Sequence, residues 1–150
     1  MLTIGLINNM PTSAIRSTER QFDELLRLAA QDMPLELRWF RLSGARPATY
    51  GRLEDLWASE LDGLIVTGAE PRASVLSEEP FWAPLTRTID WAAQHTISSI
   101  WSCLAAHAAV LHLDGVERRR FDEKIFGVFA CTKTIEHEML TNLHSWAVPH

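Results

Sequence analysis

The short apolar run Gly63-Leu64-Ile65-Val66 constrains the fold of this chain most strongly. It lies in the segment DGLIVTG, between Asp62 and Gly68. A strand whose residues do not alternate with polar ones is typical of a parallel sheet that is covered on both faces. We therefore predict a buried strand over residues 62–68 that stops at Gly68.

Strand and helix patterns alternate along the first part of the chain. Apolar or alternating runs predict further strands at residues 2–7, 35–42 and 97–103. Helical spacing of apolar residues predicts helices from Ser17 to just before Pro34, and over 52–60, 80–95 and 104–113. This order is typical of an α/β protein with a doubly wound, mostly parallel sheet and helices on both faces. Past Gly115, the run 125–130 predicts strands on an edge or a face of that sheet, within a single domain over 1–150.

Composition argues against several classes of protein. A formal charge of −5 and a pI near 5.6 argue against a nucleic-acid binder, which needs a concentrated basic face. Apolar runs fall well short of the roughly 20 residues of a membrane span, and the N-terminal segment reads as a first strand instead of a signal peptide. The 2 cysteines provide no disulfide framework, so we expect a cytoplasmic protein with free thiols. The histidines show no spacing typical of a metal site, and we expect neither a metal nor a cofactor.

A cysteine lies where a predicted strand meets a predicted helix. Cys103 follows Ile100-Trp101-Ser102 and precedes Leu104-Ala105-Ala106. On such a sharp turn a nucleophile stands at the carboxyl edge of the sheet, and small residues after it let the helix start close to the strand. The start of the helix favours a thiolate, and the backbone N–H of Leu104 would serve as an oxyanion donor. A free cysteine is also commonly a small buried hydrophobe, and the segment lacks the glycines of G-x-C-x-G, so both interpretations stay open.

The end of the buried strand offers a second oxyanion donor. Gly68 can turn the backbone so that its own N–H, or that of Ala69, points into the crevice at the edge of the sheet. A plain turn that ends the strand explains the same residues. Taken by themselves, they favour the plain turn.

Several segments, in their order and spacing, resemble the homoserine O-succinyltransferase (homoserine O-acyltransferase) family. No single segment carries the resemblance alone, but together they span nearly the whole chain. The resemblance implies a fold similar to that of class I glutamine amidotransferases. The segments are Asn9-Met10-Pro11, Thr18-Glu19 with Gln21, residues 62–69, Phe81-Trp82, Asp90-Trp91, Cys103 with Ala105, Ala108 and Ala109, Lys124 with residues 126–129, and Pro149-His150.

The resemblance implies roles for three side chains. Cys103 matches the family's cysteine, which takes an acyl group from the co-substrate acyl-CoA and passes it to the hydroxyl of L-homoserine. Lys124 matches a lysine that contacts the substrate, although an exposed surface lysine fits the sequence as well. Arg72 stands where family members carry Glu with acetyl donors or Gly with succinyl donors. A guanidinium there would pair with the distal carboxylate of succinyl-CoA, while an exposed arginine without a role fits equally well.

The chain departs from the family pattern at two places. Residues 104–107 replace a Trp-Gly-Ala-Gln segment, which bears on the substrate more than on the fold. The family's catalytic His and Glu lie downstream of Pro149-His150, so we expect these 150 residues alone to be inactive. The implied activity is a homoserine acyltransferase of methionine biosynthesis, with a homodimer as the family-level expectation. Two rivals remain: a glutamine amidotransferase-like thiol hydrolase, and a truncated non-catalytic domain.

Overall fold

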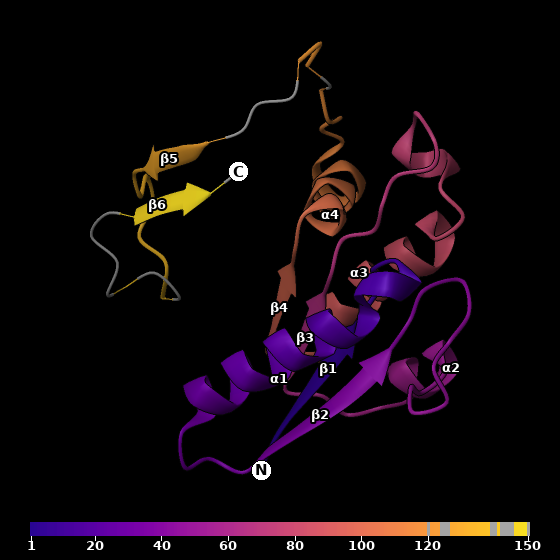
Figure 1. The fold of residues 1–150 in the computed structure, drawn as a ribbon, viewed down its shortest axis with the longest axis vertical. Coiled ribbons are helices and arrows are strands. Elements are labelled where there is room, and N and C mark those ends of the chain that lie inside the picture. Colours follow the sequence, from indigo (N-terminus) through magenta and orange to yellow (C-terminus); the bar gives the residue numbers. More distant parts are fainter. Residues whose placement is uncertain (120, 124–126, 139–140, 142–145, 150) are drawn as a thin grey trace. The chain divides into compact units, whose positions relative to one another are not determined.

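The computed structural model describes residues 1–119, 121–123, 127–138, 141 and 146–149. Its contacts divide the chain into two compact units, Met1–Arg118 and Arg119–His150 (Figure 1). The single domain over 1–150 stays a prediction.

A four-stranded parallel sheet forms the centre of the first unit. Its strands are β1 (Leu2–Ile7), β2 (Leu35–Phe40), β3 (Gly63–Val66) and β4 (Ser98–Trp101), in the spatial order β2-β1-β3-β4. The chain passes from β1 outward to β2, then returns to β3 and continues outward to β4 on the other side. The order therefore reverses between β1 and β3, and in such sheets ligands bind outside the carboxyl ends of the strands at this point. We call this end of the sheet the carboxyl edge and the opposite end the amino edge.

Four helices accompany the sheet. They are α1 (Ile15–Ala30), α2 (Leu53–Trp57), α3 (Trp82–His95) and α4 (Leu104–Asp114), with single 3-10 turns at η1 (Thr12–Ala14) and η2 (Leu76–Glu78). Every predicted helix and strand of the first unit is present, with bounds shifted by a few residues. The α/β fold with a parallel sheet is confirmed, while the glutamine amidotransferase-like class stays a prediction.

The helix ends follow from local chemistry. Gln31, at a φ of 52°, ends α1, and Pro34 follows it. Gly115, in the left-handed conformation with a φ of 68°, ends α4 and donates its N–H to the carbonyl of Leu111 at 3.1 Å. Both positions need a residue that tolerates a positive φ, and glycine does so without a steric penalty.

One face of the sheet carries the main hydrophobic core. Leu64 and Val66 of β3 point to this face and pack with Leu56 of α2, Leu85 of α3 and Ala108 of α4, all at most 1% exposed. Burial of these side chains is the main favourable contribution to folding.

The opposite face of the sheet is covered less evenly. Successive residues of a strand point to opposite faces, so Leu6, Ile65 and Ile100, which are aligned across three strands, share this second face. Their exposure rises from 0% to 7% and then 43% toward β4. Figure 1 shows α1 in front of the sheet and α3 behind it, so helices lie on both faces.

The second unit contains a small antiparallel sheet. Strand β5 (Val128–Cys131) pairs with β6 (Trp146–Pro149), in a sheet separate from the four-stranded one. Residues 125–130 were predicted to form strands on an edge or a face of the parallel sheet. For the described part of this run the edge alternative is wrong, while the face alternative stays a prediction. Sequence shows that a segment prefers to be extended, but the strand that pairs with it is chosen by tertiary structure. In the described part of the chain, no helix has the length and apolar character needed to cross a membrane.

Candidate functional site

Cys103 occupies a strained corner between β4 and α4. Its φ is 55° and its ψ is −123°, and α4 begins at the next residue. Only one other non-glycine residue in the described structure, Gln31, has a positive φ. Such a conformation costs on the order of 1–3 kcal/mol and persists only where the surrounding structure enforces it. A strained strand-to-helix turn of this kind presents the nucleophile in α/β hydrolases.

Backbone hydrogen bonds hold this corner on both sides. The N–H of Ser102 donates to the carbonyl of Val66 at 2.9 Å, which extends the pairing of β3 with β4 to the residue before the cysteine. The N–H of Ala106 donates to the carbonyl of Cys103 at 3.0 Å and starts the helix. The positive φ therefore lies between two fixed segments.

The side chain of Cys103 is accessible. The residue is exposed and its thiol is free, so it is not a buried hydrophobe of the core. The thiol stands at the first residues of an 11-residue helix, where the helix dipole favours a negative charge. This is the environment in which a cysteine can act as a nucleophile.

Gly68 lies directly against the corner. A Cβ added to Gly68 would stand 2.9 Å from the Cβ of Cys103, 3.0 Å from the backbone nitrogen of Leu104 and 3.3 Å from Sγ. Real Cβ atoms essentially never approach another atom as closely as 2.9 Å, so this position requires glycine. The backbone N–H of Leu104 finds no acceptor among the described residues, as is usual for the first donors of a helix. Gly68, Leu104 and the thiol are thus brought together.

Thr67 connects the loop after β3, which carries Gly68, to the loop after β1. Its N–H donates to the carbonyl of Ile7 at 3.0 Å, and its hydroxyl accepts the backbone N–H of Asn9 at 2.9 Å. The same hydroxyl donates to the carbonyl of Gly68 at 3.2 Å. This role was not predicted from the sequence, although a threonine at the end of a buried strand is a sign of it.

Asn8, which is fully buried, fixes the loop after β1 through hydrogen bonds of its side chain. Its side-chain nitrogen donates to the carbonyl of Ile15 at 3.2 Å and to the hydroxyl of Tyr50 at 3.1 Å, and its oxygen accepts the N–H of Met10 at 3.2 Å. Burial, and then a hydrogen bond with Glu19, raises the pKa of the Tyr50 phenol, so this hydroxyl stays protonated. These buried hydrogen bonds therefore hold the segment Asn9-Met10-Pro11 in a fixed position at the carboxyl edge.

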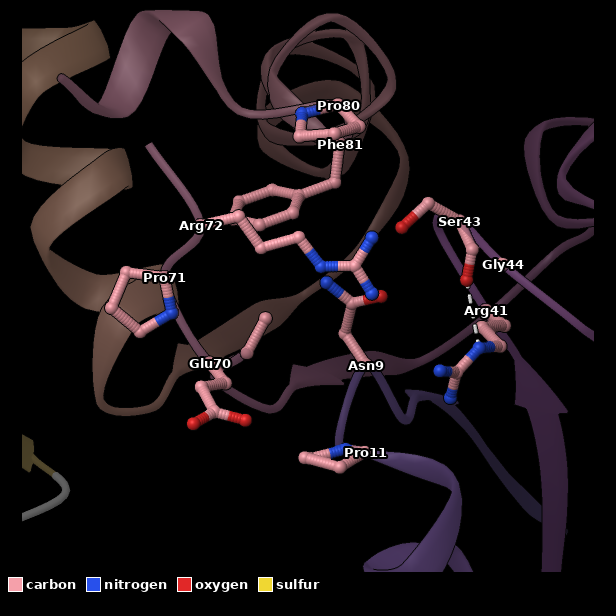
Figure 2. Close-up of a pocket in the computed structure, with 11 residues that line it drawn as sticks. Asn9, Pro11, Arg41, Ser43, Gly44, Glu70, Pro71, Arg72, Pro80 and Phe81 are labelled. Atoms are coloured by element: carbon pink, nitrogen blue, oxygen red, sulfur yellow. Dashed lines mark hydrogen bonds between the residues drawn. The ribbon is translucent and has the colours of Figure 1, made fainter. Parts of the chain in front are cut away.

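A cavity of about 160 Å³ opens beside this loop (Figure 2). Asn9, Arg41, Ala69, Arg72 and Phe81 are among the residues that line it. In Figure 2 the guanidinium of Arg72 extends across the cavity toward the side chain of Asn9. A space of this size accepts a small polar group and not a whole cofactor.

The two arginines of the cavity differ in their partners. Arg41 donates to the backbone carbonyls of Ser43 at 2.7 Å, Met10 at 2.9 Å and Asn8 at 3.1 Å, so it mainly holds loops together. Burial is the main cause that lowers its pKa, and the nearby charge of Arg72 lowers it further. Arg72 is exposed, and its guanidinium has no hydrogen bond or ion pair to any described residue. The cavity therefore offers an unpaired positive charge.

The remaining candidate residues contribute less. Ala69 lines the cavity, and its N–H makes no hydrogen bond to a described residue. Lys124 lies outside the described residues. His112 pairs with Asp90 at 2.8 Å and His95 bonds the carbonyl of Trp91 at 2.8 Å, whereas no described histidine forms a hydrogen bond with Cys103. Among the residues that the structure describes, no group of three or more His, Cys, Asp or Glu side chains could hold a metal ion.

Comparison with known proteins identifies relatives over the full chain. The family model described as homoserine O-succinyltransferase matches residues 1–150. A homoserine O-succinyltransferase of Rhodopseudomonas palustris is 48% identical, and the match covers 100% of this chain and 48% of that protein. One of Bradyrhizobium japonicum is 46% identical over 94% of this chain and 46% of its own length. One of Methylorubrum extorquens is 43% identical over 99% and 46%.

The chain thus spans about half the length of these relatives. Within that half, the match extends from the first strand of the parallel sheet through the strained corner and into the second unit. The chain belongs to the homoserine O-succinyltransferase family.

Proposed function

We propose that the protein carrying this chain is an acyltransferase of methionine biosynthesis that moves an acyl group from acyl-CoA to the hydroxyl of L-homoserine. The observation that carries the proposal is the exposed Cys103 thiol at a positive-φ corner, against Gly68 and beside the unpaired N–H of Leu104. The names of the relatives support the same reaction class.

The proposed reaction has two steps. In the first, the Cys103 thiolate attacks the carbonyl of the acyl-CoA thioester, and the tetrahedral oxyanion collapses with release of the CoA thiolate, which takes up a proton. In the second, the homoserine hydroxyl attacks the new thioester on Cys103, loses its proton to a base, and leaves as the O-acyl ester while the thiol is restored.

The backbone around the corner would stabilise the oxyanion. The N–H of Leu104 is fixed by the start of α4, and that of Gly68 or Ala69 is the proposed second donor. Donors that are already aimed at the developing charge lower the barrier because they need no reorganisation during the reaction.

Arg72 is the proposed determinant of the acyl donor. Its guanidinium is unpaired and crosses a small cavity, which suits the distal carboxylate of a succinyl group. A bidentate guanidinium–carboxylate pair would favour succinyl-CoA over acetyl-CoA. Lys124 is proposed as a contact to a substrate carboxylate on the resemblance alone.

Mass spectrometry tests the first step. We expect incubation with succinyl-CoA to add one succinyl group to Cys103, and Cys103→Ala to abolish the adduct. Cys131→Ala is the matched control, because it removes the other free cysteine and leaves the thiol of Cys103 in place, so the adduct should persist. Absence of an adduct, or hydrolysis of glutamine without use of acyl-CoA, would contradict the proposal.

A donor comparison tests the role of Arg72. Arg72→Met keeps most of the side-chain length but removes the charge, so we expect the rate of Cys103 acylation by succinyl-CoA to fall about tenfold relative to acetyl-CoA. An unchanged ratio of the two rates would remove Arg72 from the proposal while leaving the cysteine chemistry intact.

A further inference from the structure

Glu79 is a buried carboxylate behind the loop that carries Arg72. It lies between η2 and α3, and only 3% of its surface is exposed. Burying a charged group is unfavourable unless hydrogen bonds compensate for the lost water. The partners of this carboxylate therefore show what it holds in place.

Both partners of Glu79 belong to one loop. Its Oε1 accepts the backbone N–H of Arg72 at 2.7 Å and that of Ala73 at 2.8 Å. Bonds from an N–H group to an ionised carboxylate are stronger than bonds between neutral groups. The second oxygen, Oε2, is buried and has no partner in the described structure.

The backbone of Glu79 is itself fixed from both sides. Its N–H donates to the carbonyl of Leu76 at 3.2 Å, and its carbonyl accepts the N–H of Trp82 at 2.9 Å. Leu76 and Phe81, which flank it, are 2% and 5% exposed and belong to the core. Glu79 is therefore a rigid point of attachment.

The loop has no comparable support of its own. Among described residues, the segment 69–74 makes no hydrogen bond other than the two that Glu79 accepts. Ala69 packs against the core at the start of the segment, so the carboxylate of Glu79 provides all of the hydrogen bonds, but not all of the packing, that hold the loop over the cavity. The guanidinium of Arg72 makes no bond to Glu79, because Glu79 accepts only the backbone N–H of this residue. The guanidinium therefore keeps its donors for a ligand.

We propose that Glu79 is a positioning residue that sets the place of the Arg72 guanidinium over the cavity and thereby the preference for a dicarboxylic acyl donor. The inference rests on the proposed function, in which Arg72 pairs with the distal carboxylate of the donor. A fixed backbone reduces the conformational freedom that a long side chain loses on binding, so the pairing becomes more favourable.

The ratio of Cys103 acylation rates with succinyl-CoA and acetyl-CoA tests this role. We expect Glu79→Ala to lower the ratio about tenfold, mainly through a slower reaction with succinyl-CoA, because charge-assisted bonds to the loop are lost. Glu79→Gln keeps an oxygen acceptor at the same position and should hold the ratio within about threefold of the unaltered protein. Combining Glu79→Ala with Arg72→Met should cost no more than Arg72→Met alone, since both act through one guanidinium.

Asp62→Ala is the matched control. The carboxylate of Asp62 also accepts a backbone N–H, that of Thr3 at 2.7 Å, but it does so at the amino edge. Its loss should leave the donor ratio unchanged. Should Glu79→Ala not fold, Glu79→Asp withdraws the carboxylate by one methylene and should lower the ratio severalfold.

Hydrogen–deuterium exchange over residues 68–76 helps to distinguish a wrong role for Glu79 from a wrong proposed function. We expect faster exchange in Glu79→Ala and no change in Asp62→Ala. If the unaltered protein forms a thioester and Glu79→Ala keeps both its donor ratio and its exchange, the inference about Glu79 is wrong while the proposed function stands. If the unaltered protein accepts neither donor, the proposed function is overturned, whatever the exchange shows.

Discussion

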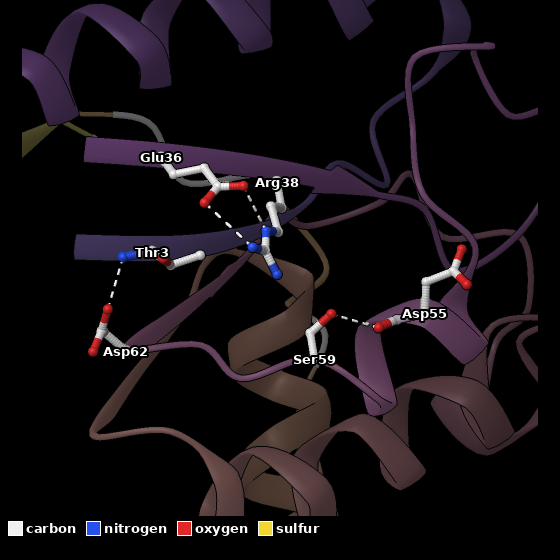
Figure 3. Close-up of polar contacts among 6 residues, drawn as sticks. All are labelled: Thr3, Glu36, Arg38, Asp55, Ser59 and Asp62. Carbon is white, nitrogen blue, oxygen red and sulfur yellow. Dashed lines mark hydrogen bonds and ion pairs between the residues drawn. The ribbon is translucent and has the colours of Figure 1, made fainter. Parts of the chain in front are cut away.

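The two ends of the parallel sheet differ in whether they leave reactive or charged side chains without a partner. At the amino edge, side chains pair with their neighbours: Arg38 donates to both carboxylate oxygens of Glu36, at 2.8 and 3.2 Å, and Asp62 accepts the N–H of Thr3 (Figure 3). At the carboxyl edge, the thiol of Cys103 and the guanidinium of Arg72 have no partner among the described residues.

Cavity size does not indicate which end of the sheet holds the functional site. The larger hollow, about 620 Å³, lies at the amino edge and is lined by Glu36, Arg38 and Asp62, among others. The cavity beside Arg72 is about 160 Å³. Unsatisfied groups held in fixed positions, and not volume, are what a site needs, because paired groups must first break their own bonds to bind a ligand.

Replacing the strained cysteine should give the largest effect. We expect Cys103→Gly to abolish acylation by succinyl-CoA and, because glycine tolerates a φ of 55°, to raise the free energy of unfolding by about 1 kcal/mol. Intact mass and chemical denaturation measure the two effects.

Gln31→Gly is the control for Cys103→Gly. Gln31 has a φ of 52° at the end of α1, so the same relief of strain is expected there without a change in acylation. A loss of stability in Cys103→Gly would show that the corner is not strained in the way the backbone angles indicate.

The two glycines that bound β3 offer the sharpest contrast between the edges. In Gly68→Ala the new methyl would meet the Cβ of Cys103 at 2.9 Å and the backbone of Leu104 at 3.0 Å, neither of which can yield easily. We expect about 2 kcal/mol lower stability and about 100-fold slower acylation.

Gly63→Ala, at the amino edge, should be milder. Its new methyl would meet the flexible end of Ile4 at 3.0 Å and the carbonyl of Ser98 at 3.5 Å, so a small side-chain shift accommodates it. We expect less than 1 kcal/mol of destabilisation and normal acylation. Equal acylation rates in Gly63→Ala and Gly68→Ala would break the distinction between the edges.

Removing the carboxylate of Asp62 should affect stability alone. Asp62→Ala leaves the N–H of Thr3 without its acceptor, and we expect a loss of about 1–2 kcal/mol in the free energy of unfolding. Acylation of Cys103 should proceed at the normal rate. A slower reaction would mean that the two edges are coupled.

The smallest effect is expected at the exposed pair of Glu36 and Arg38. The hydrogen bond from Arg38 lowers the pKa of Glu36, so any stabilisation is present at neutral pH and is lost as the pH falls through that lowered pKa. Exposed ion pairs contribute little, so Glu36→Gln should barely change Tm at pH 7 and not at all in acid. Thermal unfolding at both pH values checks this, and a large change at pH 7 would contradict it.

Much of the carboxyl edge could be predicted from local patterns. The run before Gly68 and the junction at Cys103 each combine a strand ending with a small or reactive residue, and adjacent parallel strands bring such endings together. Asn8, Thr67 and Glu79 could not be assigned roles in the same way. Their partners lie up to 60 residues away in the chain, as Ile7 does from Thr67, or in a loop whose path is not encoded by any periodic pattern.

The sequence by itself determined the order of strands and helices in the first unit and the place of Cys103 between a strand and a helix, because apolar periodicity and small residues act locally. Tertiary structure decided which strand pairs with β5, how closely Gly68 approaches the thiol, and that the carboxylate of Glu79 binds the loop of Arg72. Those outcomes depend on distances between segments that are remote in sequence, and only packing of the whole chain sets such distances.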